Sequence, residues 1–128
     1  MAKGKILIID DEKLVRLMLT DLLQMKGYTV VAAEDGPTGL AAAKKEKPNV
    51  IILDVMMPGM DGFAVCEALK NDGATTGIPV IILTASEDAH LTKKAFKAGA
   101  AFTLVKAGKP DQLLSTLHLA LSLHRPSL

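Results

Sequence analysis

Five short apolar runs, separated by longer segments with helix signals, form the main pattern of the chain. The runs occupy residues 5–9, 28–33, 50–53, 80–83 and 102–105. Continuous apolar runs of this length are typical of strands buried on both faces. The segments that follow them predict helices over residues 14–25, 36–47, 62–71, 89–98 and 110–124. Apolar residues at helical spacing and Gly or Pro stop signals support these helices.

This alternation predicts an α/β fold with a (βα)5 pattern. Strands joined through helices call for a parallel sheet that right-handed crossover helices cover on both faces. We expect the doubly wound, flavodoxin-like strand order 2-1-3-4-5, in which the chain reverses between the first and third strands. A chain of 128 residues with 49% hydrophobic content is long enough for one well-buried core, so we expect a single domain over residues 1–128.

Polar residues follow all five predicted strands, with Glu34 and Asp35 after the second, and the candidates for a shared site follow the other four. Asp10 and Asp11 follow the first, Asp54 the third, Thr84 the fourth and Lys106 the fifth. Because the carboxyl ends of parallel strands lie at one edge of the sheet, these side chains should gather at the switch point, where ligands bind in open α/β sheets. Each residue alone has a simpler interpretation as a turn, a helix cap or a solvated strand end. Their joint placement favours a site.

The types of residue in this group predict phosphoryl chemistry. Crowded carboxylates repel one another, and Mg²⁺ would relieve that repulsion. Thr84 and Lys106 supply a hydroxyl and a cation, which are groups suited to phosphoryl oxygens. Asp54 is then the nucleophile that attacks phosphorus in line and forms an aspartyl phosphate.

The residues that carry this chemistry also carry a family resemblance. The chain resembles a bacterial two-component response-regulator receiver domain over nearly its whole length. The matching pieces are Ile8–Glu12, Leu53–Gly62, Ile82–Ala85, and Ala98–Ala100 leading to Lys106. The resemblance implies a regulatory switch rather than an enzyme, in which Asp54 accepts phosphate from a sensor histidine kinase or a histidine phosphotransfer protein.

The resemblance also implies a metal site and an output face. It implies that Mg²⁺ is bound by Asp11, Asp54 and the backbone carbonyl of Met56, with Asp10 acting mainly through water. Thr84 and Lys106 would sense the phosphoryl group. The face formed by the fourth helix, the fifth strand and the fifth helix would respond by changing its binding to a downstream protein target.

Two positions depart from the family pattern. Most receivers have a proline directly after the lysine, whereas here Lys106 is followed by Ala107 and the proline comes four places on, at Pro110. We therefore expect a trans Lys106–Ala107 bond and a looser loop. The usual switch aromatic is replaced by Thr103, and the neighbouring Phe102 should point to the opposite face of the strand.

Composition narrows the possible classes of function. A net charge of +1 and 3% aromatic residues argue against direct nucleic-acid binding. The apolar runs are too short to span a membrane, and we expect no signal peptide before the first strand. A lone cysteine, Cys66, excludes an internal disulfide, fits a reducing cytoplasm, and is expected at a buried helix position.

Exposed leucines are candidates for partner surfaces. On the last helix, Leu119 and Leu123 lie to the side of the apolar face. If exposed, they would form an apolar ridge for a partner or a dimer. The simpler interpretation is that they are scattered surface leucines. Leu17 and Leu23 on the first helix lie where the family meets its histidine donor. We expect a monomer or a weak dimer.

We expect the chain to be a stand-alone receiver, and three alternatives remain open. The first is a receiver fragment of a longer regulator. An aspartyl-phosphate-forming phosphatase of the haloacid-dehalogenase type would carry a second Asp two places after the nucleophile, where Met56 stands. A flavin carrier would need a phosphate-cradling loop after the first strand, where the acidic residues 10–12 would repel phosphate.

Overall fold

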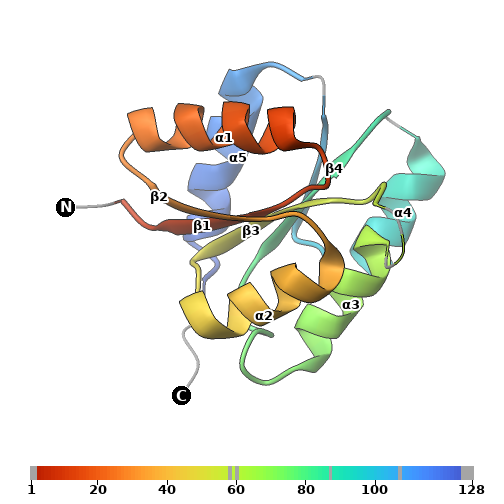
Figure 1. Cartoon of the computed structure of the whole chain (residues 1–128). Coiled ribbons are helices and arrows are strands. Elements are labelled where there is room, and N and C mark those ends of the chain that lie inside the picture. Colours follow the sequence, from red (N-terminus) through yellow and green to blue (C-terminus); the bar gives the residue numbers. More distant parts are fainter. Residues whose placement is uncertain (1–2, 58, 60, 87, 107, 125–128) are drawn as a thin grey trace.

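The computed structural model describes residues 3–57, 59, 61–86, 88–106 and 108–124. This part of the chain forms one parallel sheet in the order β2-β1-β3-β4-β5, joined by helices (Figure 1). The strands are β1 (Lys5–Ile9), β2 (Thr29–Ala33), β3 (Val50–Asp54), β4 (Val80–Thr84) and β5 (Phe102–Val105). The helices are α1 (Lys13–Met25), α2 (Gly36–Glu46), α3 (Gly62–Asn71), α4 (Ala89–Lys97) and α5 (Pro110–Leu121). The predicted fold class and strand order are confirmed.

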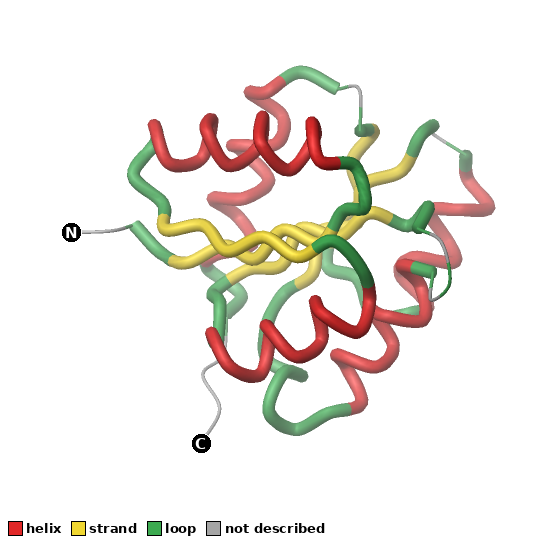
Figure 2. The backbone as a smooth tube through the Cα atoms, viewed as in Figure 1, coloured by secondary structure: helices red, strands yellow, loops and turns green. Residues whose placement is uncertain are grey.

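The helices form two layers, one on each face of the sheet. Helices α1 and α5 cover one face, and α2, α3 and α4 cover the other (Figures 1 and 2). Side chains alternate along each strand, so Ile6 and Ile8 of β1 join the core under α1 and α5, while Leu7 and Ile9 join the core on the other face. The two cores together bury both faces of the central strands.

The three central strands and the edge strand β5 differ in burial. Every residue of β3 and β4 is buried, as are four of the five in β1, whereas all four residues of β5 are only half-buried. This follows from position, because β5 pairs with a single neighbour, β4. Residues at the carboxyl end of β3 therefore rest on a rigid support that β5 lacks.

Gly62 allows the start of α3 to lie close to the end of β3. An added Cβ there would contact the backbone carbonyl oxygen of Asp54 and lie 2.5 Å from the Cα of Val55. The Gly62 N–H also donates to the Val55 carbonyl at 3.2 Å. Helix α3 begins at this residue, capped by the Asp61 carboxylate on the Ala64 N–H at 2.8 Å. The absence of a side chain thus lets α3 pack directly beneath Asp54.

Several boundaries and one helix face differ from the predictions. Helix α5 ends at Leu121 rather than near His124, because the following N–H groups turn to carbonyls three residues back. Strand β2 begins at Thr29 rather than Tyr28. The prediction that Leu23 is exposed was wrong, since this residue is fully buried under α1. Leu17 is exposed as predicted, and three further apolar residues of that helix are exposed as well: Leu14, Met18 and Met25.

Other burial predictions are confirmed. Leu119 and Leu123 are exposed, and Cys66 is fully buried in α3. Among the described residues, no helix is both long and apolar enough to cross a membrane.

Candidate functional site

Asp54 lies at the carboxyl end of β3 and is almost fully buried, with 2% of its surface exposed. Its Oδ1 accepts a hydrogen bond from the Met56 N–H at 3.3 Å, and its Oδ2 lies 3.3 Å from Nζ of Lys106. The side chain of Met56 itself points outward and is exposed. A carboxylate is therefore held at the edge of the sheet by backbone on one side and a cation on the other.

Asp10 lies beside Asp54 because β1 and β3 are paired in parallel. It is 1% exposed, and its Oδ1 accepts a hydrogen bond from the Glu12 N–H at 2.9 Å. The Arg16 guanidinium fixes the same turn by donating to the Asp10 carbonyl at 2.7 Å. Asp10 Oδ2 lies 3.1 Å from Nζ of Lys106, but it receives no well-directed hydrogen bond from any described residue.

Lys106 follows β5 and connects the acidic residues. Its backbone N–H donates to the Thr84 carbonyl at 2.7 Å, which continues the pairing of β4 and β5 by one step. Its Nζ contacts three carboxylates at once: Glu12 at 2.7 Å, Asp10 at 3.1 Å and Asp54 at 3.3 Å. One ammonium thus serves as counter-ion to acids from two strand ends.

These contacts change the acidity of the groups in the site. Burial, and then the neighbouring charge of Asp10, raise the pKa of the Asp54 carboxyl, and the contacts with Met56 and Lys106 only partly oppose this. Burial alone would lower the pKa of Lys106, but hydrogen bonds to Glu12 and Asp10 outweigh it and raise that pKa above its ordinary value. Lys106 therefore remains a cation at neutral pH.

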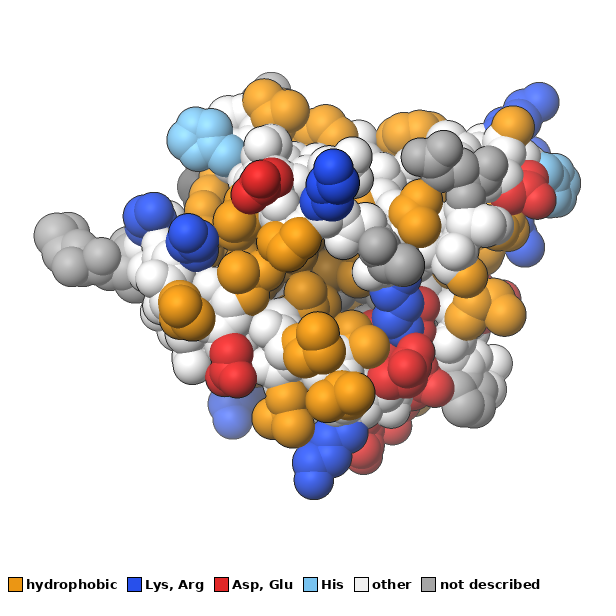
Figure 3. Space-filling view, turned by 90° about the horizontal axis from the view of Figure 1, so that it is seen from above, with side chains coloured by type: hydrophobic (Ala, Val, Ile, Leu, Met, Phe, Trp, Pro, Cys, Tyr) orange, Lys and Arg blue, Asp and Glu red, His pale blue; other side chains and the backbone are white. Residues whose placement is uncertain are grey.

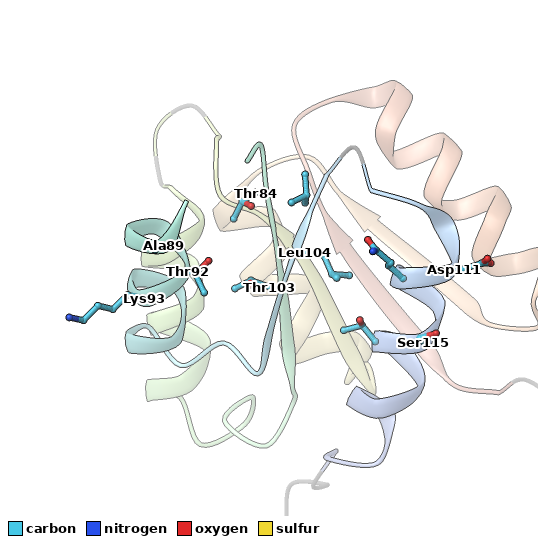
Figure 4. A pocket seen from close by; sticks show the side chains of 11 residues that line it. Thr84, Ala89, Thr92, Lys93, Thr103, Leu104, Asp111 and Ser115 are labelled. Atoms are coloured by element: carbon cyan, nitrogen blue, oxygen red, sulfur yellow. The ribbon is translucent and has the colours of Figure 1, made fainter. Parts of the chain in front are cut away.

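Thr84 ends β4 on the same edge and is also buried. Its hydroxyl donates to the Ser86 carbonyl at 2.8 Å. Below it a groove of about 860 Å³ runs over β5 between α4 and α5, with Thr84, Thr92 and Thr103 along its wall (Figure 4). Phe102 packs into the opposite core, so the predicted facing of Thr103 and Phe102 agrees with the structure.

The acidic cluster contains a residue that the sequence analysis did not single out. Carboxylate oxygens of Asp10, Asp11 and Glu12 lie within 4.8 Å of one another. Asp54 joins this group through Lys106. The sequence could have indicated Glu12 only through its place directly after the acidic pair. Its partner Lys106 lies 94 positions away in the chain, so the contact itself could not be predicted.

The donor set fits a hard cation such as Mg²⁺. Such ions take carboxylate and carbonyl oxygens, and the buried Asp10 Oδ2, beside two further acids, accepts no hydrogen bond from the part of the chain that the structure describes. The predicted metal residues Asp10 and Asp54 are brought together around one point, and Asp11 lies exposed beside them. The predicted Lys106–Ala107 bond falls partly outside the described residues.

The doubly wound sheet carries an acidic pair after β1, a buried aspartate at the end of β3, a hydroxyl at the end of β4 and a lysine after β5. This combination matches the class of receiver domains of signalling proteins. The model of the family described as "Response regulator receiver domain" matches residues 6–118. The chain belongs to this family, which confirms the resemblance inferred from the sequence. Such domains serve two-component signalling as switches.

Relatives of the chain differ in length. Protein PilH of Pseudomonas aeruginosa is 36% identical over 119 residues, covering 93% of this chain and 98% of PilH. The probable transcriptional regulator ycf27 of Porphyridium aerugineum is 40% identical over 113 residues, but the chain spans only 46% of it. Among solved structures, the chemotaxis protein CheY4 of Vibrio cholerae superimposes with a TM-score of 0.88 at 36% identity, covering 93% of this chain and 99% of that one.

Proposed function

We propose that this chain is the phospho-accepting receiver of a two-component system or phosphorelay, and that Asp54 is the acceptor. The observation that carries the proposal is the buried Asp54 carboxylate, which sits at the open edge of the sheet with Nζ of Lys106 at 3.3 Å and a second buried acid beside it. Aspartate is seldom fully buried, and here two buried aspartates share one lysine at a ligand-binding edge of the sheet. The lysine, together with a divalent cation held by the acids, would offset the charge of the phosphoryl group that such a site receives.

The reaction follows from the positions of these groups. An Asp54 carboxylate oxygen attacks the phosphorus of a phosphohistidine donor, so an O–P bond forms and the P–N bond breaks. The electron pair of the broken bond stays on the imidazole nitrogen, which takes a proton. Mg²⁺, held by Asp10, Asp11, Asp54 and the Met56 carbonyl, would supply neutralisation of the phosphoryl charge when bound.

Two residues would then change partners. Lys106 would exchange its contact with Asp54 Oδ2 for a phosphoryl oxygen, since the ammonium already lies 3.3 Å from the acceptor. Thr84 would release the Ser86 carbonyl and donate to the phosphoryl group instead. This release would free the loop before α4, and the groove over β5 begins at the same residue. We therefore propose the α4–β5–α5 face as the surface that signals to a downstream protein.

The histidine donor would dock on a different surface. Hydrophobic side chains gather on the face over α1 and α5 (Figure 3), and the exposed large hydrophobic residues of α1 are Leu14, Leu17, Met18 and Met25. Between α1 and the start of α5 lies an apolar pocket of about 280 Å³, whose lining includes Met18, Pro110 and Lys106. Because this patch reaches Lys106, a helical donor bound there would carry its phosphohistidine to Asp54.

The test is phosphorylation by a small donor. The protein is incubated with Mg²⁺ and acetyl phosphate, followed by intact-mass and peptide mass spectrometry. We expect one added phosphoryl group on Asp54, and none in Asp54→Asn. Asp61→Asn is the matched control, because Asp61 is an exposed acid in the following loop and should leave the adduct in place. An adduct on another residue, or none while beryllofluoride also fails to bind, would contradict the proposal.

A further inference from the structure

The strongest contact of Lys106 is with an acid outside the pocket. Nζ lies 2.7 Å from Glu12 Oε1, compared with 3.1 Å and 3.3 Å to Asp10 Oδ2 and Asp54 Oδ2. A distance of 2.7 Å lies within the usual range of charge-assisted N–H···O bonds, whereas 3.1 Å and 3.3 Å lie beyond that range. The ammonium is therefore drawn toward the rim of the site rather than onto the Asp54 carboxylate.

The side chain of Glu12 is free for this contact. Glu12 is the N-cap residue of α1, but its side chain makes no cap hydrogen bond. Its backbone N–H already holds Asp10 Oδ1 at 2.9 Å. One residue thus fixes Asp10 through its backbone and Lys106 through its carboxylate, and both groups belong to the pocket around Asp54.

The loop that carries Lys106 offers little other restraint. Lys106 follows the half-buried edge strand β5, and its backbone is held there by the bond to the Thr84 carbonyl. No proline follows it directly in sequence. The long, flexible stem of a lysine leaves the ammonium free to settle on the carboxylates that attract it most. Its position is therefore set by side-chain contacts, of which Glu12 makes the shortest.

We propose that Glu12 is a positioning residue that holds the Lys106 ammonium at the rim of the pocket, within reach of a phosphoryl group but off the Asp54 nucleophile. Without Glu12, Nζ closes on Asp54 and Asp10, and this tighter ion pair masks the oxygen that attacks phosphorus. The inference rests on the proposed role of Asp54 and adds a residue to the machinery around it.

A double-mutant cycle tests whether Glu12 acts through Lys106. Phosphorylation rates with acetyl phosphate are compared for wild type, Glu12→Ala, Lys106→Ala and the double variant. We expect Glu12→Ala to slow the reaction about three- to fivefold, the loss that corresponds to one partly exposed ion pair. The phosphorylation rate of Glu12→Gln should fall between those of wild type and Glu12→Ala, because an amide oxygen still accepts a hydrogen bond, although a weaker one. In the Lys106→Ala background, removal of Glu12 should have no further effect.

Two outcomes of the cycle would overturn the proposal. Equal losses in both backgrounds would show that Glu12 acts independently of Lys106. A faster reaction in Glu12→Ala would show that Glu12 competes for the lysine instead of positioning it. Glu34→Gln, which removes an exposed acid after β2, is the control for a general change in charge.

Two further measurements separate this role from metal binding and from the proposed function. In the Lys106→Ala background, removal of Glu12 should lower Mg²⁺ affinity no more than Glu34→Gln does, and a larger loss would identify Glu12 as a metal ligand and overturn the proposal. In metal-free protein, the ¹⁵Nζ signal of Lys106 should shift in Glu12→Ala, and an unchanged signal would contradict the contact. If wild type accepts no phosphoryl group, the proposed function fails while this spectrum still decides the contact.

Discussion

Strands β3 and β5 both end in the candidate site, yet they support it in different ways. Strand β3 lies between β1 and β4, and all its residues are buried. Strand β5 lies at the edge, and all its residues are half-exposed. Asp54 is thus built into the rigid centre of the sheet, and Lys106 follows its least supported strand.

This difference suggests how a site can be both fixed and responsive. The group proposed to accept a phosphoryl must be held in one place, because in-line attack tolerates little displacement. The group proposed to report it must change partners, which is easier where few buried contacts oppose movement. The centre of the sheet provides the fixed position for the acceptor, and the edge of the sheet provides the freedom for the reporting group to change partners. Four predictions test this contrast.

The largest effect is expected from truncating the central strand. Ile52→Ala removes a fully buried side chain of β3 and should lower the free energy of unfolding by about 4 kcal/mol. Leu104→Ala on half-buried β5 should cost about 2 kcal/mol, because its site is already partly open. Urea unfolding followed by circular dichroism measures both. Equal losses would remove the contrast in support between the two strands.

The next effect concerns the glycine beneath Asp54. Gly62→Ala places a methyl group against the backbone of Asp54 and Val55, which cannot yield easily, so stability should fall by about 3 kcal/mol. Gly73→Ala is the matched control, since an added Cβ there meets nothing within 4 Å, and it should change stability by less than about 1 kcal/mol. Similar values for the two variants would show that α3 is free to move away from β3.

The loss of stability on removing the shared cation, Lys106, should depend on whether Mg²⁺ is present. Lys106→Met leaves the buried carboxylates of Asp10 and Asp54 without their counter-ion, and in metal-free buffer this should cost about 2 kcal/mol. Millimolar Mg²⁺ should restore most of that loss, because a bound cation takes over the same role. Thermal unfolding with and without Mg²⁺ measures the difference, with Lys93→Met on exposed α4 as control. A loss that Mg²⁺ leaves unchanged would contradict a metal site among these acids.

The smallest expected effect is a pH dependence with opposite signs at two aspartates. Burial, and then Asp10, raise the pKa of Asp54 above its ordinary 3.8, so its ionised form opposes folding at neutral pH. Asp54→Asn should therefore be more stable than wild type at pH 7, and the gain should vanish as the pH falls below 3.8.

The pKa of Asp72 shifts in the opposite direction to that of Asp54. Hydrogen bonds from Lys44 and from the Ala74 N–H lower its pKa, so Asp72→Asn should be slightly less stable at neutral pH. That loss should disappear as the pH falls through the lowered pKa of Asp72. Denaturant midpoints measured between pH 3 and 8 test both signs, and parallel curves for the two variants would be incompatible with these shifts.

The sequence was sufficient for features that depend on local signals. Strand ends are marked by the change from apolar to polar residues, so Asp10, Asp54, Thr84 and Lys106 could be placed at one edge of the sheet before the structure was known. The buried face of α1 could not be chosen, because Leu17, Leu22 and Leu23 fit more than one apolar stripe and only packing against the sheet selects Leu23. The bond between Thr84 and Ser86 and the contact between Glu12 and Lys106 depend on side-chain torsions that no sequence pattern records.

The separation of the site residues along the chain has a consequence for protein synthesis. Asp54 and Lys106 are 52 positions apart, which a ribosome takes roughly 3 to 10 seconds to translate. During that interval the emerging chain holds its acidic residues without the lysine that neutralises them. The pocket is completed only when β5 joins the edge of the sheet, so a donor that requires the finished pocket acts on fully made domains and leaves unfinished ones unlabelled.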